Sequence, residues 1–444
     1  MILIHQFGKT SLLIILVHFF NTVHCQNPSY QDPFKINQHI KSIETNKGVY
    51  NLAEQLSRQL GEPTAADSLE RLINIIKSDT AYFSKNYRHF YQCLMNLYSF
   101  ISDNKKSIEY EEKANLKSPP KIPTETIYDN IKILNAQEYI VTKFGDKQII
   151  LFNEAHNRGQ IRAFISSLLP KLYELGYRHI GLEALSYYDF SLHDRGYPIK
   201  SSGYYIKEPA FAELIREGLS IGFHFFPYDD TSQVYNFSQR EQTQAENIYK
   251  LAKSVYPEKV IVLGGYGHIS KINVENKVMG CRLVELLKSS IPAVDCTTLI
   301  EYNNKEIEHP MYNYLSDTLM LDEPSVVLLN DEPFVSKEWK NGADVCVFLP
   351  RTNYDLTYPN WLKQNKIPYS IAIPDSLNSD NQFVKIFKKR EIEEVNDKAI
   401  PLLQFMGSTN QKRFNAFLKP GEYLVYIYNG SGKIEYKSDL IIKH

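Results

Sequence analysis

The residues best suited to acid–base chemistry follow two apolar runs of the sequence. The first run, Ile149–Phe152, is followed closely by four residues with polar or ionisable side chains: Asn153, Glu154, His156 and Asn157. The second run, Val260–Leu263, leads through a glycine-rich stretch to His268. Because an imidazole beside a carboxylate can move protons at neutral pH, these two segments favour a reactive site.

Two further apolar runs end in carboxylates. His179–Leu182 is followed by Glu183, and Gly222–Phe226 is followed by Asp229 and Asp230. If the four runs are parallel neighbours in one sheet, their carboxyl ends lie at the same edge, where ligands bind. We therefore expect the polar side chains to converge on one crevice.

Each of these residues also has a structural explanation when taken singly. Glu154 could favour the start of a following helix, where carboxylates suit the helix dipole. Asp229 or Asp230 could cap a loop, and His268 could lie in the core. Polar residues follow all four strand-like runs at equivalent positions. A single shared site explains all four at once, whereas the structural explanations must each be invoked separately.

Two kinds of chemistry fit this set of residues, and the residue types do not choose between them. In one, a histidine takes a proton from water while a carboxylate orients it. In the other, a divalent metal activates the water, with four possible ligands: His156, Glu154, Glu183 and His268. A serine nucleophile is disfavoured because no Gly-x-Ser-x-Gly motif is present. The stretch Gly264–Gly267 lacks the Lys-Ser/Thr pair of a nucleotide-binding loop.

Alternation of strand-like and helix-like segments predicts an α/β fold, with a mainly parallel sheet flanked by helices. The expected strands are Ile149–Phe152, His179–Leu182, Gly222–Phe226, Val260–Leu263 and Ala293–Leu299. The expected helices are Gln160–Leu175, Glu208–Glu217, Gln239–Ser254 and Val278–Ser289. Apolar runs at 325–329 and 345–349 are expected to extend this sheet.

The two ends of the chain differ from this α/β unit, which we place at 128–355. Residues 26–116 have helical spacing, including Tyr87–Tyr98, and the proline-rich stretch 117–127 is the expected linker. Residues 380–444 predict a small β-rich unit. It ends in a hairpin, whose strands Tyr423–Tyr428 and Ile434–Tyr436 flank an Asn-Gly turn.

The first 25 residues resemble an export signal. Lys9 precedes an apolar stretch too short to span a bilayer permanently, and a cleavage site follows at Cys25. We expect a secreted or periplasmic protein with no transmembrane segment after cleavage. His24 stands where a lipoprotein signal needs a small residue, so lipid attachment at Cys25 is disfavoured.

Composition narrows the classes of partner. The net charge of -1 disfavours nucleic acid, because no basic excess is present to neutralise phosphates. Four cysteines remain after cleavage without a Cys-x-x-Cys pair. Cys281 and Cys296 could form a disulfide, and buried free thiols are an equal alternative.

Four segments together resemble the superfamily of erythromycin esterase, ChaN, TraB and Tiki proteins. Asn153-Glu154-Ala155-His156 is similar to its Gly-Glu-x-His motif, and Gly181-Leu182-Glu183 to its second-strand glutamate. Arg240–Ile248 resembles the helix of esterase-like members, and Gly264–His268 a late histidine motif. The resemblance covers roughly residues 148–300 and implies a hydrolytic crevice.

The resemblance implies roles for these residues. His156 would be the base, Glu154 and Glu183 would orient it, His268 would contact water or substrate, and Arg240 would stabilise negative charge. Substrate contacts are expected from five residues: Asn153, Asn157, Asp229, Asp230 and Tyr266. Asn153 replaces the glycine of the motif, where it would tolerate a left-handed turn but hinder close approach of a substrate.

We therefore expect an exported hydrolase that cleaves an ester or related acyl bond of a small molecule or peptide, with no required cofactor. Two alternatives follow from other branches of the superfamily. One is a haem- or metal-binding surface protein like ChaN, and the other is a metal-dependent peptidase like Tiki and TraB.

Overall fold

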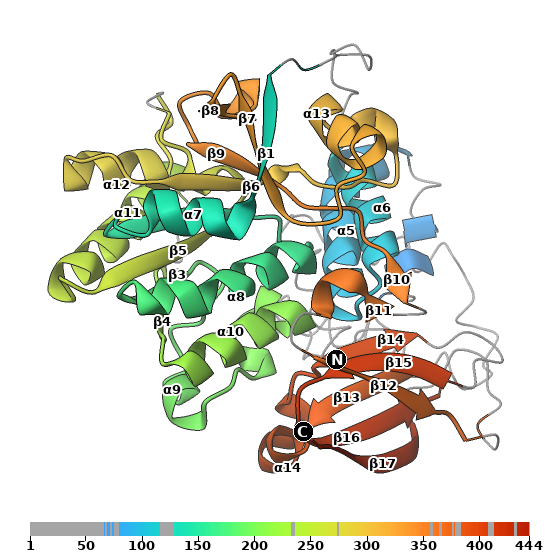
Figure 1. Ribbon diagram of the computed structural model, residues 1–444. Coiled ribbons are helices and arrows are strands. Elements are labelled where there is room, and N and C mark those ends of the chain that lie inside the picture. The colour runs from blue at the N-terminus through green and yellow to red at the C-terminus, as the bar shows by residue number, and fades with distance from the viewer. Residues whose placement is uncertain are drawn as a thin grey trace, which may run out of the picture.

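The computed structural model of this chain describes residues 66, 69–71, 73–74, 80–115, 128, 130–231, 236–272, 275–355, 358–363, 366–374, 377, 383–406, 413–429 and 433–443. The expected signal peptide at 1–25 and the linker at 117–127 lie outside these residues. Figure 1 shows an α/β unit, with β-rich sheets below it and a pair of N-terminal helices beside it.

A mixed, mostly parallel sheet forms the centre of the α/β unit. Its strands follow the order β1-β7-β9-β6-β2-β5-β3-β4, with β8 paired to β7. Their bounds are β1 (Ile131–Asn135), β2 (Ile149–Glu154), β3 (Tyr177–Leu182), β4 (His224–Pro227), β5 (Lys259–Gly265), β6 (Ala293–Leu299), β7 (Ser325–Leu329), β8 (Glu332–Pro333) and β9 (Val345–Phe348). The α/β class and the mainly parallel sheet expected from the sequence are confirmed.

Helices cover both faces of this sheet (Figure 1). On one face α7 (Ala136–Phe144), α8 (Gly159–Glu174) and α10 (Pro209–Ile221) pack on Ile150 and Phe152 of β2. On the other face α11 (Phe237–Ser254) and α12 (Met279–Leu287) pack on Ile149 and Leu151. Because alternate residues of a strand point to opposite faces, a strand covered on both sides needs a continuous apolar run.

Four neighbouring parallel strands bring their carboxyl ends to one edge. β2 pairs with β5, β5 with β3, and β3 with β4, and all three pairings are parallel. The expectation that the polar residues after these strands share one edge is therefore confirmed.

The strands predicted at 325–329 and 345–349 extend the sheet beyond β6. β9 is parallel to β6, whereas β7 runs antiparallel to both β9 and β1. This antiparallel edge lies away from the four strand ends that carry the polar residues.

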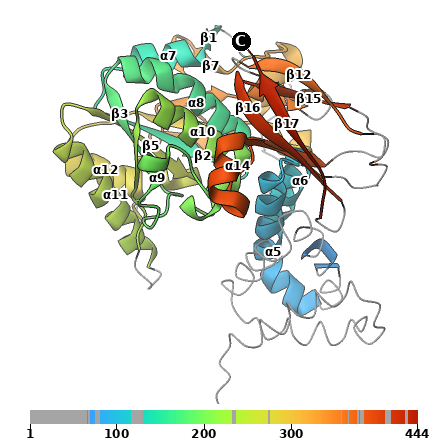
Figure 2. The same ribbon diagram turned by 90° about the horizontal axis from the view of Figure 1, so that it is seen from below.

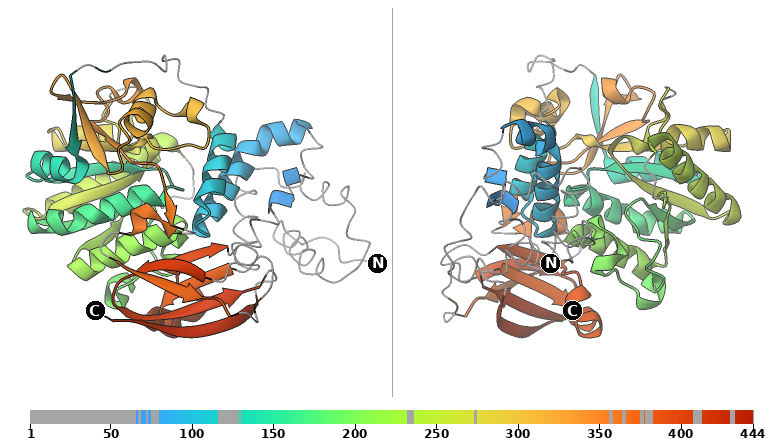
Figure 3. Two further views of the ribbon diagram at one scale, coloured as in Figure 1. Left: turned by 45° about the vertical axis from the view of Figure 1, so that its right-hand side comes forward. Right: turned by 180° about the vertical axis from the view of Figure 1, so that it is seen from behind.

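Two antiparallel helices, α5 (Thr80–Phe100) and α6 (Asn104–Asn115), precede the α/β unit. Buried side chains of α5, including Phe90 and Leu94, form a core with Ala66, Leu69 and Ile73. Figure 3 shows the two helices standing against the side of the α/β unit.

The C-terminal part is a β-rich unit of two small sheets. One has the order β14-β13-β16-β17, and the other pairs β12 with β15. β12 lies before residue 380, where we expected this unit to begin. The bounds are β12 (Ile367–Ala372), β13 (Phe383–Lys388), β14 (Leu403–Met406), β15 (Arg413–Leu418), β16 (Gly421–Tyr428) and β17 (Ile434–Ile442). The predicted hairpin is present as the antiparallel pair β16 and β17.

Helix α14 (Lys389–Val395) joins this β-rich unit to α10 (Figure 2). Arg216 of α10 donates hydrogen bonds to both carboxylate oxygens of Glu391, at 2.9 Å and 2.7 Å, and to the carbonyl of Ile400. Arg216 and Glu391 are both buried, so the two units share a desolvated ion pair.

Short segments complete the described chain. They are α9 (Leu192–Arg195), η2 (Lys200–Ser202), η3 (Tyr205–Lys207), η4 (Tyr266–Ile269), η5 (Lys305–Ile307), α13 (Pro310–Asn313), η6 (Tyr314–Thr318), η7 (Lys337–Trp339), β10 (Tyr354–Asp355), β11 (Tyr358–Pro359), η8 (Asn360–Leu362) and η9 (Asn396–Lys398).

The four cysteines of the described residues are buried free thiols, so the alternative of a Cys281–Cys296 disulfide is not realised. In the same part of the chain, no helix combines the length and apolarity that crossing a membrane requires.

Candidate active site

A cavity of about 240 Å³ lies at the carboxyl ends of β2, β3 and β5. Its lining includes all five residues expected to be catalytic, together with Asp229 and several apolar or aromatic groups. The complete lining is Glu154, His156, Glu183, Ala184, Tyr205, Phe211, Asp229, Arg240, Leu263 and His268. Residues far apart in the sequence, from Glu154 to His268, thus meet in one crevice.

The first histidine of the cavity is oriented by a carboxylate. His156 Nδ1 lies 3.1 Å from Glu154 Oε1. The other oxygen of Glu154 accepts a hydrogen bond from Arg162 Nε at 2.5 Å. Burial alone would raise the pKa of Glu154, but Arg162 and His156 together hold it below its ordinary value. Glu154 is therefore an ionised partner for the imidazole.

Arg162 is fully buried and fixes the turn that carries His156. Besides Glu154, it donates to the backbone carbonyl of His156 and to Glu208 Oε2, both at 3.0 Å. Glu208 is the N-cap of α10, where its side chain accepts from the amides of Ala210 and Phe211. The Arg162 guanidinium thus forms hydrogen bonds with both the start of α10 and the turn after β2.

Aromatic rings and a glycine define the position of the His156 ring. Tyr205 stacks on it at 4.1 Å between ring centroids, and Tyr266 meets it edge-on at 5.1 Å. A Cβ on Gly265 would lie 2.3 Å from His156 Cε1 and 2.8 Å from Nε2. Only glycine at the end of β5 leaves room for this imidazole.

Glu183 accepts hydrogen bonds from two directions. Its Oε2 receives the amide of Gly265 at 2.6 Å, and its Oε1 receives Arg240 Nη2 at 2.6 Å. Burial opposes ionisation, but His268, His156, Arg240 and the Gly265 amide outweigh it and lower the pKa of Glu183 to about 2. Glu183 is a fixed negative charge between the two histidines.

Arg240 lies on α11 and is held in a bidentate pair with Asp229. Its Nε and Nη2 each lie 2.8 Å from one Asp229 oxygen, and Gln244 also donates to Asp229 at 2.7 Å. The ion-pair partners of Arg240 are Glu183 and Asp229. The guanidinium Nη1 also lies 3.5 Å from His268 Nε2.

The second histidine of the cavity, His268, is also paired with a carboxylate. His268 Nδ1 lies 2.6 Å from Glu241 Oε1, while its Nε2 lies 3.6 Å from Glu183 Oε1. Glu241 is fully buried, and its other oxygen accepts the amide of Met279 at the start of α12. Burial lowers the pKa of His268, but Glu241 and Glu183 more than offset this and raise it above its ordinary value.

Four residues expected to contact substrate do not line the cavity. Asn153 is fully buried, and its amide nitrogen donates to Tyr266 O, Asp295 and Thr297, while its oxygen accepts the amide of Cys296. Asn153 has an extended backbone as part of β2 and no positive φ, so the expected left-handed turn is absent. Its side chain instead ties β2 to β6.

The other three differ from one another. Asn157 is buried and donates to Ser107 and Glu111 of α6, so it faces the N-terminal helices. Tyr266 is partly exposed and touches the site through its ring against His156. Asp230 adjoins the site through its amide, which donates to Asp229.

Sequence reasoning missed four residues that orient the site: Arg162, Tyr205, Glu208 and Glu241. Arg162 had a detectable signal, because it occupies the apolar stripe of α8 one turn before Ile165 and two before Leu169. Glu208 precedes Pro209 in a helix-start pattern. Nothing in the sequence indicated the stacking of Tyr205 or the contact between Glu241 and His268.

The donor set does not fit a metal ion. Glu154 directs its oxygens at Arg162 and the His156 ring. Glu183 directs its oxygens at Arg240 and the Gly265 amide, so a cation would have to displace one of these partners. Across the described ranges, no group of three or more His, Cys, Asp and Glu is placed to hold a metal. Haem also fits poorly, because it needs apolar walls and this small cavity is lined mainly by ionisable groups.

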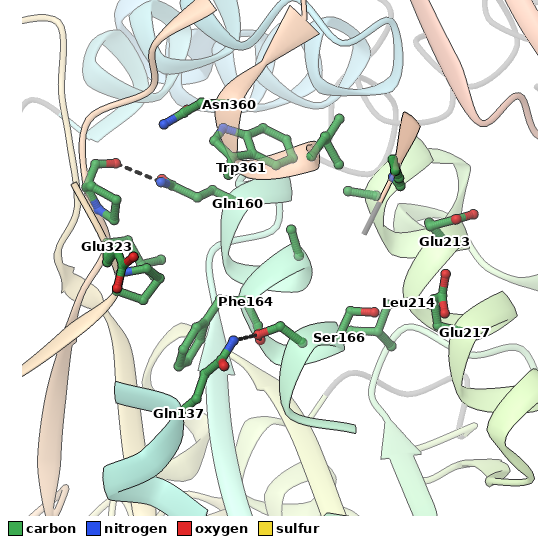
Figure 4. A pocket seen from close by; sticks show the side chains of 18 of the residues that line it. Gln137, Gln160, Phe164, Ser166, Glu213, Leu214, Glu217, Glu323, Asn360 and Trp361 are labelled. Carbon is green, nitrogen blue, oxygen red and sulfur yellow. Dashed lines mark hydrogen bonds between the residues drawn. The ribbon is translucent and has the colours of Figure 1, made fainter. Parts of the chain in front are cut away.

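A larger cavity of about 530 Å³ lies elsewhere, over α8 and α10 (Figure 4). Gln160 and Trp361 lie at one end of it, and Glu213 and Glu217 at the other. Its lining contains no histidine or cysteine. It therefore lacks the acid–base pairs of the smaller cavity, and size alone does not identify the reactive site.

Comparisons with known proteins identify no family. No protein-family model matches the chain, and no curated protein matches it. Among solved structures, it is similar to the type III effector HopBA1, with 16% identity over 44% of this chain and 94% of that one, at a TM-score of 0.29.

Two further likenesses cover smaller parts of the matched chains. RRSP, a MARTX toxin effector domain from Vibrio vulnificus, is 15% identical over 59% of each chain, at a TM-score of 0.29. A structure described as bacterial protein toxins is 20% identical over 37% of each chain, at a TM-score of 0.27. These similarities are too weak to carry an argument, so the assignment of the site depends on its geometry alone.

Proposed function

We propose that this protein is a hydrolase that cleaves an ester or related acyl bond with water activated by His156. The observation that carries the proposal is the pairing of two histidines with separate carboxylates around one cavity. His156 is paired with Glu154, and His268 with Glu241. Arg240 lies beside the second pair.

His156 has the geometry of a general base. A proton on Nδ1 directed at Glu154 leaves Nε2 free to accept a proton from water on the cavity side. The resulting hydroxide attacks the acyl carbon and forms a tetrahedral oxyanion. Arg240, although paired with Glu183 and Asp229, contributes positive potential near this charge.

His268 has the properties of a general acid. Its raised pKa favours the protonated ring, because Glu241 and Glu183 stabilise the imidazolium. Transfer of its Nε2 proton to the leaving oxygen or nitrogen accompanies cleavage of the acyl bond. The proton held by His156 then returns to His268 through solvent, which restores both rings.

The proposal retains membership of the erythromycin esterase, ChaN, TraB and Tiki superfamily. In support of it, each of the four resembling motifs contributes at least one ionisable residue to the cavity lining, and together they contribute Glu154, His156, Glu183, Arg240 and His268. The metal-dependent and haem-binding alternatives gain no comparable support from the arrangement of donors. Export through residues 1–25 stays a prediction.

A panel of p-nitrophenyl esters and short peptides tests the proposal on purified protein. We expect ester turnover that falls about 10²- to 10⁴-fold in His156→Ala, the range for loss of a general base. His179→Ala is the matched control, because His179 also pairs with a glutamate, Glu258, but does not line the cavity. Full activity of His156→Ala would rule out the assigned base.

A further inference from the structure

The N-terminal helix α6 contacts the turn that carries His156. Asn157, the residue after His156, donates to Glu111 Oε2 at 3.0 Å and to Ser107 Oγ at 3.3 Å. Ser107 and Glu111 lie one helical turn apart on α6 and so present one face to this turn.

Glu111 also binds the next residue of the turn. Arg158 Nε donates to Glu111 Oε2 at 2.9 Å, and its Nη2 lies 2.8 Å from the same oxygen. Glu111, Asn157 and Arg158 are all buried. Because a desolvated charge needs a partner, Glu111 and Arg158 hold each other in one geometry.

A series of aromatic contacts connects the end of α5 to the ring of His156. Phe100 meets Tyr204 edge-on at 5.3 Å between centroids, and Tyr204 meets Tyr205 edge-on at 5.2 Å. Tyr205 is the ring that stacks on His156. The helical pair therefore supports His156 both through its backbone turn and through its ring.

We propose that α5 and α6 are part of the active site, with Glu111 as a positioning residue that holds the His156 turn. The inference rests on the proposed function and extends it to two helices whose sequence indicates no functional role. Arg162 fixes the carbonyl of His156 from the α/β side, and Glu111 fixes Asn157 and Arg158 from the helical side. Small errors in the placement of a base are costly, since a displacement of about 1 Å can reduce turnover about 10²-fold.

Glu111→Gln tests this role against a matched control, Glu112→Gln. Glu112 lies next to it on α6, and its carboxylate accepts the amide of Asn304 rather than a group of the His156 turn. On the best ester of the panel, we expect kcat of Glu111→Gln to fall about 10- to 100-fold with KM nearly unchanged. Glu112→Gln should retain the wild-type kcat.

A second variant covers the case in which Glu111→Gln does not fold. Glu111→Leu combined with Arg158→Met replaces the buried ion pair with apolar side chains of similar size, an exchange that proteins often tolerate. Asn157 then lacks its carboxylate acceptor, so we expect a folded protein whose kcat is still at least about tenfold reduced. A folded double variant with wild-type kcat would overturn the inference.

Histidine NMR provides a readout that does not depend on turnover. In ¹³C-histidine-labelled protein, the Cε1–Hε1 signal of His156 is assigned by its loss in His156→Ala. We expect that signal to shift or broaden in Glu111→Gln, with the His179 signal unchanged. An unmoved signal would overturn the positioning role, whereas an active His156→Ala would overturn the proposed base instead.

Discussion

At the scale of single residues, the site is defined by the hydrogen-bond and ion-pair partners that orient each reactive side chain. Glu154 and Glu241 each support one histidine, and both have a second fixed partner, Arg162 and the Met279 amide. Glu183 differs because it lies between the histidines and pairs with Arg240. Because each histidine has its own carboxylate, we expect the two histidines to have separate roles in the reaction.

The pH dependence of stability follows from Glu183. Its folded-state pKa of about 2 lies below the ordinary value of 4.5, so its stabilisation is present above pH 4.5 and is lost as pH falls toward 2. We expect wild type to exceed Glu183→Gln in unfolding free energy at pH 6 by on the order of 3 kcal/mol. Urea unfolding at several pH values should show this difference shrinking between pH 5 and 2. A pH-independent difference would contradict the assignment.

At the scale of elements, strand ends explain why the sequence was informative. The apolar runs of β2 and β5 predicted strands buried on both faces, and the residues after them were therefore expected at one edge. The direction of single side chains was less predictable. Asn153 and Asn157 flank Glu154 and His156 in the sequence but point to β6 and α6, because partners distant in the chain determine their orientation.

Asn153 provides a prediction at this scale, since it occupies the position of the motif glycine. Asn153→Gly would remove the acceptor of the Cys296 amide and one of the donors to Asp295, which keeps its hydrogen bonds from Thr297. We expect a loss of about 2–4 kcal/mol in unfolding free energy, from several buried hydrogen bonds. Urea denaturation measures this loss.

Asn130→Gly is the control for this measurement. Asn130 is exposed and has a φ of 54°, a conformation that glycine adopts readily, so we expect little change there. Equal stability of Asn153→Gly and wild type would show that the link between β2 and β6 contributes little.

At the scale of the whole molecule, both flanking parts are attached to the α/β unit by buried ion pairs. Glu111 and Arg158 join the N-terminal helices to the turn after β2, and Arg216 and Glu391 join α10 to the C-terminal unit. The sequence indicated both flanking parts as separate patterns but not these contacts. Arg216 has a local partner in Glu213, three residues before it on α10, and that contact gives no indication of the distant Glu391.

Glu391→Gln tests the C-terminal attachment. The substitution leaves Arg216 with its longer ion pair to Glu213, at 3.6 Å. Because loss of one partner from a buried ion pair costs about 3–5 kcal/mol, we expect a loss at the lower end, about 3 kcal/mol, in unfolding free energy. Glu393→Gln is the control, because Glu393 lies on the same helix and is exposed. Equal denaturation midpoints for the two variants would contradict a structural role for this pair.

The central claim is that His156 activates water for attack on an acyl carbon. Its most direct test is hydrolysis of the best panel ester in H₂¹⁸O by wild type, His156→Ala and His179→Ala. The account predicts that wild type and His179→Ala place one ¹⁸O atom in the acid product at similar rates, and that His156→Ala is slower by about 10²- to 10⁴-fold. Undiminished labelling by His156→Ala would contradict it.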